Sequence, residues 1–385
     1  MSAGSVMPVT EQCDLAVVGA GPAGSVAAMA ALRARPGLRV VLLDRADFPR
    51  DKTCGDGITP HVFDVLAELG VTSLFDDWTP VRRLALSLGN AQVQRQLRRP
   101  TWVIPRQVFD ARLVEAAVTA GASLQRRRVR TVEPGPDGVL IDGELRASVL
   151  IGADGTHSLV RTAAGLPPAR RRALALRGYV PTPANRAGLQ VISYGPGRQP
   201  SYAWSFDRGD GYSNVGYGEL LTRRRATPSR SVLLQRLEEL LPGATEEGRD
   251  WKGHHLPLSA WRWPHPDGRI LLAGDAASLV NPMTGEGIYD AVVTGMLAGR
   301  TAATTLSGAA GQQYRRAVRA RLGSHQRHTA AVARLSSSPA LVTLGIRAAA
   351  RNQDVFDDLV EVGLASGRVT RRAVRGLVSG APRRR

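Results

Sequence analysis

The sequence predicts an α/β fold, in which a parallel nucleotide-binding unit carries an inserted antiparallel sheet and ends in a helical segment. The apolar run 14–18 (DLAVV) has strand length and stops at a glycine. An alanine-rich helical stretch follows over 22–35, and 38–43 (LRVVLL) is a second buried strand by pattern. Aromatic residues and short alternating segments concentrate between 174 and 263, which favours antiparallel sheet. Residues 313–385 are helical in pattern and rich in arginine.

The remaining elements follow in order and set the expected domain boundaries. We expect a helix to open over 102–113, a short strand over 149–152, a buried strand over 269–273 and an alanine-rich helix over 288–306. These segments predict a discontinuous nucleotide-binding domain interrupted by the sheet. The expected nucleotide-binding parts are 12–75, 101–173 and 264–312, the sheet parts are 76–100 and 174–263, and the helical segment is 313–385.

The chain has 385 residues and a formal net charge of +18, and almost all of its positive charge is arginine. Lysine occurs only at Lys52 and Lys252. The arginines are scattered without an aromatic-interleaved basic motif, so we attribute them to compositional bias and expect no specific nucleic-acid partner. The arginine-rich stretch 368–385 is the segment we expect to allow peripheral contact with a membrane surface.

Cysteine usage and the absence of targeting segments predict a cytoplasmic protein. Cys13 and Cys54 give no disulfide framework, and Cys13 lies in a predicted strand as a small buried hydrophobe. The first residues lack a signal-peptide pattern, and no run of about 18 apolar residues could span a bilayer. His254, His255 and His265 match no metal-ligand spacing, so we expect structural or exposed histidines and no metal site.

The first chemical motif is Gly19-Ala20-Gly21-Pro22-Ala23-Gly24, which follows a predicted strand and opens a helix. Gly19 permits the tight turn, Gly21 lets backbone amides approach a pyrophosphate, and Gly24 permits close helix packing. Asp44, with Arg45 after it, ends the next strand, where a carboxylate can accept hydrogen bonds from ribose hydroxyls. This context predicts a Rossmann-like dinucleotide site and not merely a tight turn.

A second motif lies nearly the whole chain away. Gly274-Asp275 follows a predicted strand, and Pro282 and Gly285-Glu286-Gly287-Ile288 lead into the 288–306 helix. Amides at a helix N-terminus stabilise negative charge, such as that of a reduced flavin. Two sites so far apart in sequence make sense if both hold one long ligand. We therefore predict non-covalently bound FAD and a flavin-dependent oxidoreductase.

With the run 48–58 (FPRDKTCGDGI) and Ala153-Asp154-Gly155, the sequence resembles the geranylgeranyl reductase family. The resemblance extends from about residue 13 to about residue 308, and Cys54-Gly55-Asp56-Gly57 is its most specific part. It implies an FAD-binding domain of the glutathione reductase and p-hydroxybenzoate hydroxylase type. The implied FAD contacts are Gly19, Gly21, Gly24 and Asp44 at the adenosine diphosphate, Arg106 at the phosphate and ribityl region, Asp154 and Gly155 as a brace, Asp275 at the ribityl chain, and Gly285, Glu286, Gly287 and Ile288 at the isoalloxazine carbonyl edge.

The resemblance also implies a role for the cysteine in the glycine-rich loop. In such a reductase, Cys54 would protonate the carbon opposite the one that receives hydride. Lys52 nearby is expected to lower the pKa of the thiol. The alternative is that Cys54 is only a small space-filling residue beside the flavin.

The segment 201–207 (SYAWSFD) is similar to the family's substrate motif Tyr-x-Trp-x-Phe-Pro. Alternation places Tyr202, Trp204 and Phe206 on one strand face, an apolar wall for a lipophilic substrate, which Tyr217 could join. The alternative is a face packed into the core. Asp207 stands where proline is expected, which predicts a more polar end of the pocket and a substrate other than a simple polyprenyl chain.

The sequence thus predicts a FAD-dependent reductase of a carbon–carbon double bond in a lipophilic, isoprenoid-derived molecule. The alternative is a flavin monooxygenase, hydroxylase-like or halogenase-like, that acts on an aromatic or terpenoid metabolite within the same fold. The electron donor stays open between NAD(P)H, a partner reductase and a ferredoxin-like protein.

Overall fold

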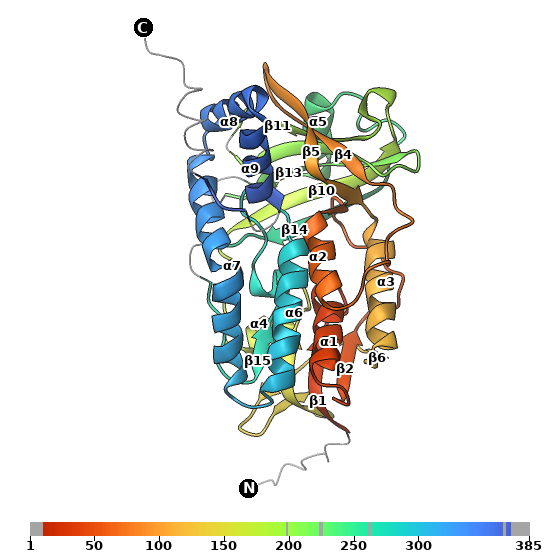
Figure 1. Cartoon of the computed structure of the whole chain (residues 1–385), viewed down its shortest axis with the longest axis vertical. Helices are drawn as coiled ribbons and strands as arrows, with labels where there is room; N and C mark the ends of the chain where they lie inside the picture. The colour runs from red at the N-terminus through yellow and green to blue at the C-terminus, as the bar shows by residue number, and fades with distance from the viewer. Residues whose placement is uncertain (1–10, 198, 223–225, 261–262, 365–366, 371–385) are drawn as a thin grey trace.

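The computed structural model describes residues 11–364 and 367–370, apart from 198, 223–225 and 261–262 (Figure 1). Residues 371–385, which hold most of the stretch expected at a membrane surface, lie outside the described residues. Within the described ranges, no helix is long and apolar enough to cross a bilayer. Two sheets organise the fold, one in the lower half of Figure 1 and the other in the upper half.

The first sheet is the predicted nucleotide-binding sheet. Within the described residues its strands are β1 (Glu11–Val18), β2 (Val40–Asp44), β6 (Ser123–Arg126), β7 (Val132–Pro134), β8 (Val139–Ile141), β9 (Leu145–Gly152) and β15 (Ile270–Leu272). β1 pairs in parallel with β2 and β9, β2 pairs with β6, and β15 pairs with β9. β8 and β7 extend the sheet in antiparallel fashion. Because β1, β2, β9 and β15 run the same way, their carboxyl ends meet at one edge, where open α/β sheets bind ligands.

Helices pack against this sheet and close its core. They are α1 (Pro22–Ala34), α2 (Pro60–Glu68), α3 (Arg106–Thr119), α4 (Leu159–Ala163), the 3-10 turn η2 (Gly274–Ala277), α6 (Ile288–Thr304) and α7 (Ala310–Leu335). In Figure 1, α1, α6 and α7 stand side by side.

The contact between α1 and α6 is made of small residues. A Cβ added to Gly295 would lie 2.2 Å from the carbonyl oxygen of Ala23, and one added to Gly299 would lie 2.1 Å from that of Ala27. The contact advances by four residues along both chains, so the two helices run parallel. Their N-termini therefore point toward the same edge of the first sheet.

The second sheet is the predicted inserted sheet. Its described strands are β3 (Gly57–Ile58), β4 (Val81–Leu88), β5 (Ala91–Val103), β10 (Arg172–Pro181), β11 (Leu189–Tyr194), β12 (Ser201–Asp207), β13 (Tyr212–Leu220) and β14 (Arg249–Pro257), in the order β14-β10-β13-β12-β11-β4-β5-β3. Neighbours pair in antiparallel fashion, as predicted, except that β11 and β4 are parallel. A parallel pair needs a long connection. The chain provides one, because it visits the first sheet and passes the short turn η1 (Ala184–Arg186) between these two strands.

Three further helices cover the second sheet. α5 (Arg230–Leu240) packs against β13, β12 and β10, while α8 (Pro339–Arg351) and α9 (Gln353–Leu364) pack against β4 and β5. Ile346 and Phe356 share a core cluster with Leu84 and Val93. Helices α8 and α9 of the C-terminal segment are therefore built into the core of the sheet domain, whereas α7 packs against α6 and β15 of the first sheet.

Two local expectations can be compared with the structure. The helix expected from residue 102 begins only at Arg106, because Trp102 and Val103 end β5 and Pro105 holds the backbone extended just before the helix. Cys13 lies in β1 with 4% of its surface exposed, which confirms the expected buried position.

Candidate active site

A cavity of about 930 Å³ lies between the two sheets and brings the distant motifs together. One part of its wall comes from the turns that follow β1, β2, β9 and β15. The other part comes from the second sheet and from Leu364 at the end of α9. The fold thus places residues that are more than 250 positions apart, such as Gly19 and Asp275, around one space.

The first glycine motif has the geometry that its spacing predicts. Gly19 has a φ of +99°, and a Cβ there would lie 2.3 Å from the carbonyl oxygen of Ala153. A Cβ on Gly24 would lie 1.8 Å from the Gly19 carbonyl oxygen, so the start of α1 packs directly on the turn. Any side chain at these two positions would force the backbones apart. Pro22 and Ala23 follow on the cavity wall.

Gly21 differs because its open side faces the cavity and two arginines. A Cβ there would meet the guanidinium groups of Arg50 and Arg106 at 3.5 and 3.9 Å. Arg106 is bound by Asp110 through two hydrogen bonds of 2.6 and 2.8 Å, and Arg50 lies 3.3 Å from the same carboxylate. An open glycine turn at the N-terminus of α1, beside two fixed cations, fits a pyrophosphate.

Asp44 lies at the carboxyl end of β2, on the cavity wall beside Arg45. One carboxylate oxygen accepts a hydrogen bond from the Ala20 amide at 2.8 Å, and the other accepts one from the Ala46 amide at 2.9 Å. Each oxygen keeps a further lone pair. The carboxylate thus braces the glycine turn, and its expected contact with ribose hydroxyls stays a prediction.

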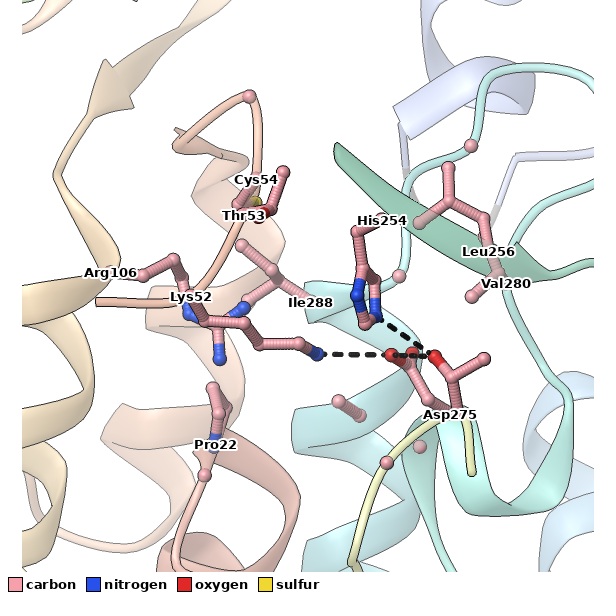
Figure 2. Close-up of a pocket in the computed structure, with 18 of the residues that line it drawn as sticks. Pro22, Lys52, Thr53, Cys54, Arg106, His254, Leu256, Asp275, Val280 and Ile288 are labelled. Carbon is pink, nitrogen blue, oxygen red and sulfur yellow. Dashed lines mark hydrogen bonds and ion pairs between the residues drawn. The ribbon is translucent and has the colours of Figure 1, made fainter. Parts of the chain in front are cut away.

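Asp275 is joined to the opposite wall by a lysine. Figure 2 shows Lys52 reaching across the cavity, where its Nζ lies 3.0 Å from Oδ2 of Asp275. The Thr156 hydroxyl lies 3.5 Å from the same oxygen and 3.1 Å from Nε2 of His254. Burial acts to raise the pKa of Asp275, but Lys52, His254 and Arg106 together outweigh it and the pKa is lowered. Asp275 is therefore ionised and can accept hydrogen bonds, and its expected contact with ribityl hydroxyls stays a prediction.

The loop before α6 caps its own helix. Oε1 of Glu286 accepts hydrogen bonds from the amides of Ile288 and Tyr289 at 2.8 and 2.9 Å. The expectation that the Ile288 amide faces a flavin carbonyl therefore needs correction, because this amide already has an acceptor. Burial raises the pKa of Glu286 to about 7. Gly285, Gly287 and the Ile288 side chain line the cavity.

The loop with the cysteine forms another part of the cavity wall. Cys54, Gly55 and Gly57 all line the cavity. Burial raises the pKa of the Cys54 thiol and outweighs the nearby Arg106 guanidinium. Lys52 acts to lower the thiol pKa, as expected, but burial raises it by more, so the net shift is upward. The thiol is neutral at neutral pH.

The aromatic wall lies beside this loop. Tyr202, Trp204 and Phe206 of β12 all line the cavity, and successive ring centroids are 6.0 and 6.5 Å apart. The Tyr202 hydroxyl donates to the carbonyl oxygen of Thr284, which ties the wall to the loop before α6. The predicted alternation thus places the three rings together on the cavity side of the sheet.

Four predicted site residues lie off the cavity wall. Gly24 and Pro282 are buried in the protein, and Asp56 is buried behind the Cys54 loop. Tyr217 packs in the core with residues of α5, and its hydroxyl donates to Glu219 at 3.0 Å. The reason is register, because Tyr217 pairs with Ala203, on the face opposite to Trp204.

Asp207 serves a turn and not the cavity. It accepts hydrogen bonds from the amides of Gly188 and Gly209 at 2.6 and 3.0 Å, and from the Thr182 hydroxyl at 3.2 Å. Its side chain is buried and absent from the cavity wall. The expected polar end of the pocket does not follow from this residue.

Asp154 and Gly155 brace the far side of the first motif. The Asp154 carboxylate accepts hydrogen bonds from the Ser158 hydroxyl at 2.5 Å and from the Val160 amide at 3.2 Å, which fixes the start of α4. Gly155 has a φ of +82° and lines the cavity with Asp154. This placement supports the brace that the resemblance implies.

The sequence reasoning set aside one cavity residue, His254, and missed another, Arg50. His265 is structural as expected, since it accepts a hydrogen bond from the Leu272 amide at 3.1 Å. His254 lines the cavity, and burial lowers its pKa to about 4, so that it stays neutral. A signal was present, because Lys252, His254 and Leu256 alternate along β14 and all line the cavity.

Comparisons with known proteins agree with an FAD site built from these residues. Residues 12–321 match the family described as FAD binding domain. The chain is 34% identical over 310 residues to menaquinone reductase of Mycolicibacterium smegmatis, covering 74% of this chain and 75% of that protein. It is 34% identical over 313 residues to digeranylgeranylglycerophospholipid reductase 1 of Methanopyrus kandleri, covering 75% and 80%.

Solved structures share the fold. A geranylgeranyl bacteriochlorophyll reductase-like protein from Thermoplasma acidophilum matches with a TM-score of 0.74 at 21% identity over 96% of both chains. A flavin-dependent brominase matches with a TM-score of 0.72 at 17% identity over 91% of this chain and 93% of that one. The cation-flanked glycine turn, the ionised Asp275 and the sequence matches lead to one conclusion: the chain belongs to the FAD binding domain family, in its geranylgeranyl reductase group, and is a FAD-dependent oxidoreductase.

Proposed function

We propose that this protein reduces a carbon–carbon double bond in a lipophilic, isoprenoid-derived molecule. When bound and reduced, FAD supplies the hydride for such a reaction. The observation that carries the proposal is that a neutral thiol and an aromatic wall line the same cavity. A Cβ on Gly55, the neighbour of Cys54, would lie 3.6 Å from the indole nitrogen of Trp204. An acid next to an apolar surface is what an alkene substrate requires.

Cys54 is the proton donor in this proposal. Burial keeps the thiol protonated at neutral pH, so that it can protonate the alkene carbon that does not receive hydride. The Arg106 guanidinium acts to lower the thiol pKa and therefore stabilises the thiolate left after proton transfer. The thiol regains its proton from solvent before the next turnover.

The aromatic wall binds and orients the substrate. Tyr202, Trp204 and Phe206 present their rings to the cavity, and Leu256 and Val280 add apolar surface near Asp275 (Figure 2). Burial of apolar substrate surface against these side chains displaces water and stabilises the complex. Such a wall favours a hydrocarbon chain over a charged substrate.

The names of two relatives support the same substrate class. At 34% identity, one is a menaquinone reductase and the other is a digeranylgeranylglycerophospholipid reductase. Both names denote lipids with isoprenoid chains. We take from them the class of substrate and not its identity.

The test is single turnover without oxygen. Photoreduced protein is mixed anaerobically with a geranylgeranyl-bearing lipid, and flavin reoxidation and product mass are followed. We expect reoxidation together with a mass increase of two hydrogens. The variant Cys54→Ala should lose about 100-fold or more in rate, as removal of a general acid does, while it keeps FAD. The control Cys13→Ala should keep the wild-type rate. Turnover that requires oxygen, with labelled oxygen in the product, would refute reduction and favour the monooxygenase alternative.

Each double-bond reduction consumes two electrons from the flavin, so an external donor must reduce the flavin again. We propose NAD(P)H or a small redox protein, either a partner reductase or a ferredoxin-like protein whose acidic surface suits the net charge of +18. Anaerobic bleaching of the flavin absorbance on addition of each donor distinguishes these candidates. A donor that bleaches the flavin no faster than buffer is excluded.

A further inference from the structure

A buried hydrogen-bond network lies behind the Cys54 loop, and Asn214 is its centre. Asn214, on β13, is fully buried. Its Nδ2 donates to the Cys54 carbonyl oxygen at 2.9 Å and to Oδ2 of Asp56 at 2.7 Å. Its Oδ1 accepts from Nε1 of Trp204 at 2.8 Å. Both amide hydrogens and the amide oxygen are therefore used, which fixes the orientation of the side chain.

Asp56 anchors the other end of this network. It is fully buried with a φ of +59°, and its carbonyl oxygen accepts from the Ile104 amide at 2.9 Å. Oδ2 accepts from the Tyr179 hydroxyl at 2.6 Å as well as from Asn214. A buried carboxylate that accepts two hydrogen bonds on one oxygen holds both donors in place. The loop therefore cannot shift without breaking contacts to β5, β10 and β13.

The indole of Trp204 is enclosed on the same side. A Cβ on Gly216, its partner across the sheet, would lie 2.3 Å from Cζ2 of Trp204, so the ring rests on the bare backbone of this glycine. On the loop side, a Cβ added to Gly55 would lie 3.6 Å from the indole nitrogen. The ring thus lies between the sheet and the loop, and its one N–H is bound by Asn214. One amide side chain connects the loop that carries the thiol with the wall that faces the substrate.

We propose that Asn214, held by Asp56, is a positioning residue that fixes the Cys54 thiol and the Trp204 indole relative to each other. This inference rests on the proposed function for the roles of Cys54 and Trp204. Neither Asn214 nor Asp56 lines the cavity, so both act through residues that do. A polyene substrate held by Trp204 would then present a chosen double bond to the thiol, and the loss of Asn214 would remove that alignment.

The first test needs no turnover, so it stands even if the substrate class is wrong. FAD-bound protein is treated with iodoacetamide, and alkylation of Cys54 is followed by peptide mass spectrometry. The variant Asn214→Leu keeps the approximate side-chain size but frees the Cys54 carbonyl and the Trp204 indole. We expect Cys54 to be alkylated at least about five times faster than in the wild type. The control Ser213→Ala, which removes the neighbouring buried hydroxyl on β13, should match the wild type.

The second test asks whether the effect passes through the thiol. The single-turnover rate is measured for Asn214→Leu, Cys54→Ala and the double variant, with FAD occupancy checked by absorbance. If Asn214 positions Cys54, the rate of the double variant should equal that of Cys54→Ala, because there is no thiol left to position. Fully multiplicative losses together with unchanged alkylation would overturn the proposal. If the wild type does not turn over the lipid but Asn214→Leu is alkylated faster, the proposed function is refuted and the positioning role of Asn214 is not.

Milder variants keep the proposal testable if Asn214→Leu fails to fold. Tyr179→Phe removes one donor to Asp56 and should raise the Cys54 alkylation rate by about twofold or more. Asp56→Asn retains an acceptor oxygen and should stay near the wild-type rate, whereas Asp56→Leu should not. Equal alkylation rates in Tyr179→Phe, Asp56→Leu and the wild type would overturn the proposal.

Discussion

Replacing Gly299 by alanine should destabilise the protein, although alanine is the better helix former. The added methyl group would lie 2.1 Å from the Ala27 carbonyl oxygen and 3.0 Å from the Ala30 side chain, so α1 and α6 would have to separate. Overpacking of a core costs about 1–3 kcal/mol, and this backbone contact lies at the upper end. The gain in helix propensity offsets about 1 kcal/mol. We therefore expect a net loss of about 2 kcal/mol in the free energy of unfolding.

The assay compares thermal unfolding of Gly299→Ala with that of Gly323→Ala. Gly323 is also helical, but the nearest atoms to its added methyl group are 3.8 Å away, so this variant should gain up to about 1 kcal/mol. For a chain of this size each kcal/mol corresponds to about 2 °C in Tm or less. Gly299→Ala should also lose flavin during gel filtration, because α6 carries the loop before Ile288. If both variants shift Tm upward, the close approach of α1 and α6 is not what Gly299 provides.

Three further predictions concern charges in the cavity. Lys52→Met leaves the Asp275 carboxylate buried without its cation, so FAD affinity at pH 7 should fall by about tenfold or more in a fluorescence titration, and an unchanged affinity would contradict this. The pKa of Cys54 is raised above its ordinary value of 9.0, so single-turnover rates should stay level from pH 6 to pH 9 and fall at higher pH; a rate that rises toward pH 9 would indicate a reactive thiolate instead. Glu286 has its pKa raised from 4.5 to about 7, so the folded state keeps a proton that the unfolded state releases. Stability should therefore fall as pH rises between these values, and Glu286→Gln should flatten that slope in urea unfolding; equal slopes would refute it.

The site residues that lie at the carboxyl ends of strands could be predicted from local sequence patterns. Gly19, Asp44 and Asp275 each follow an apolar run of strand length, and parallel strands must bring such residues to one edge. The glycine at position 19 could also be predicted to be irreplaceable, since tight turns after a strand demand left-handed backbone. These inferences need only spacing and residue type, which a single sequence supplies.

Other site features depend on register and on distant packing, which local patterns do not contain. Tyr217 was expected on the substrate wall, but pairing with Ala203 turns it to the core. Asn214 carries no motif, and its role emerges only when β13 is placed behind the Cys54 loop. Arg50 was part of a recognised run, yet its approach to Gly21 depends on the fold of the whole loop.

The parallel contact of α1 and α6 also sets a length. Gly295 is seven residues beyond the start of α6, while Ala23, which it touches, is one residue beyond the start of α1. The tip of α6 therefore projects about 9 Å past that of α1, at 1.5 Å per residue. Two helix starts held at different heights along one cavity can act as a ruler for an extended ligand. A mononucleotide flavin would reach one end only, so the spacing itself discriminates in favour of the dinucleotide.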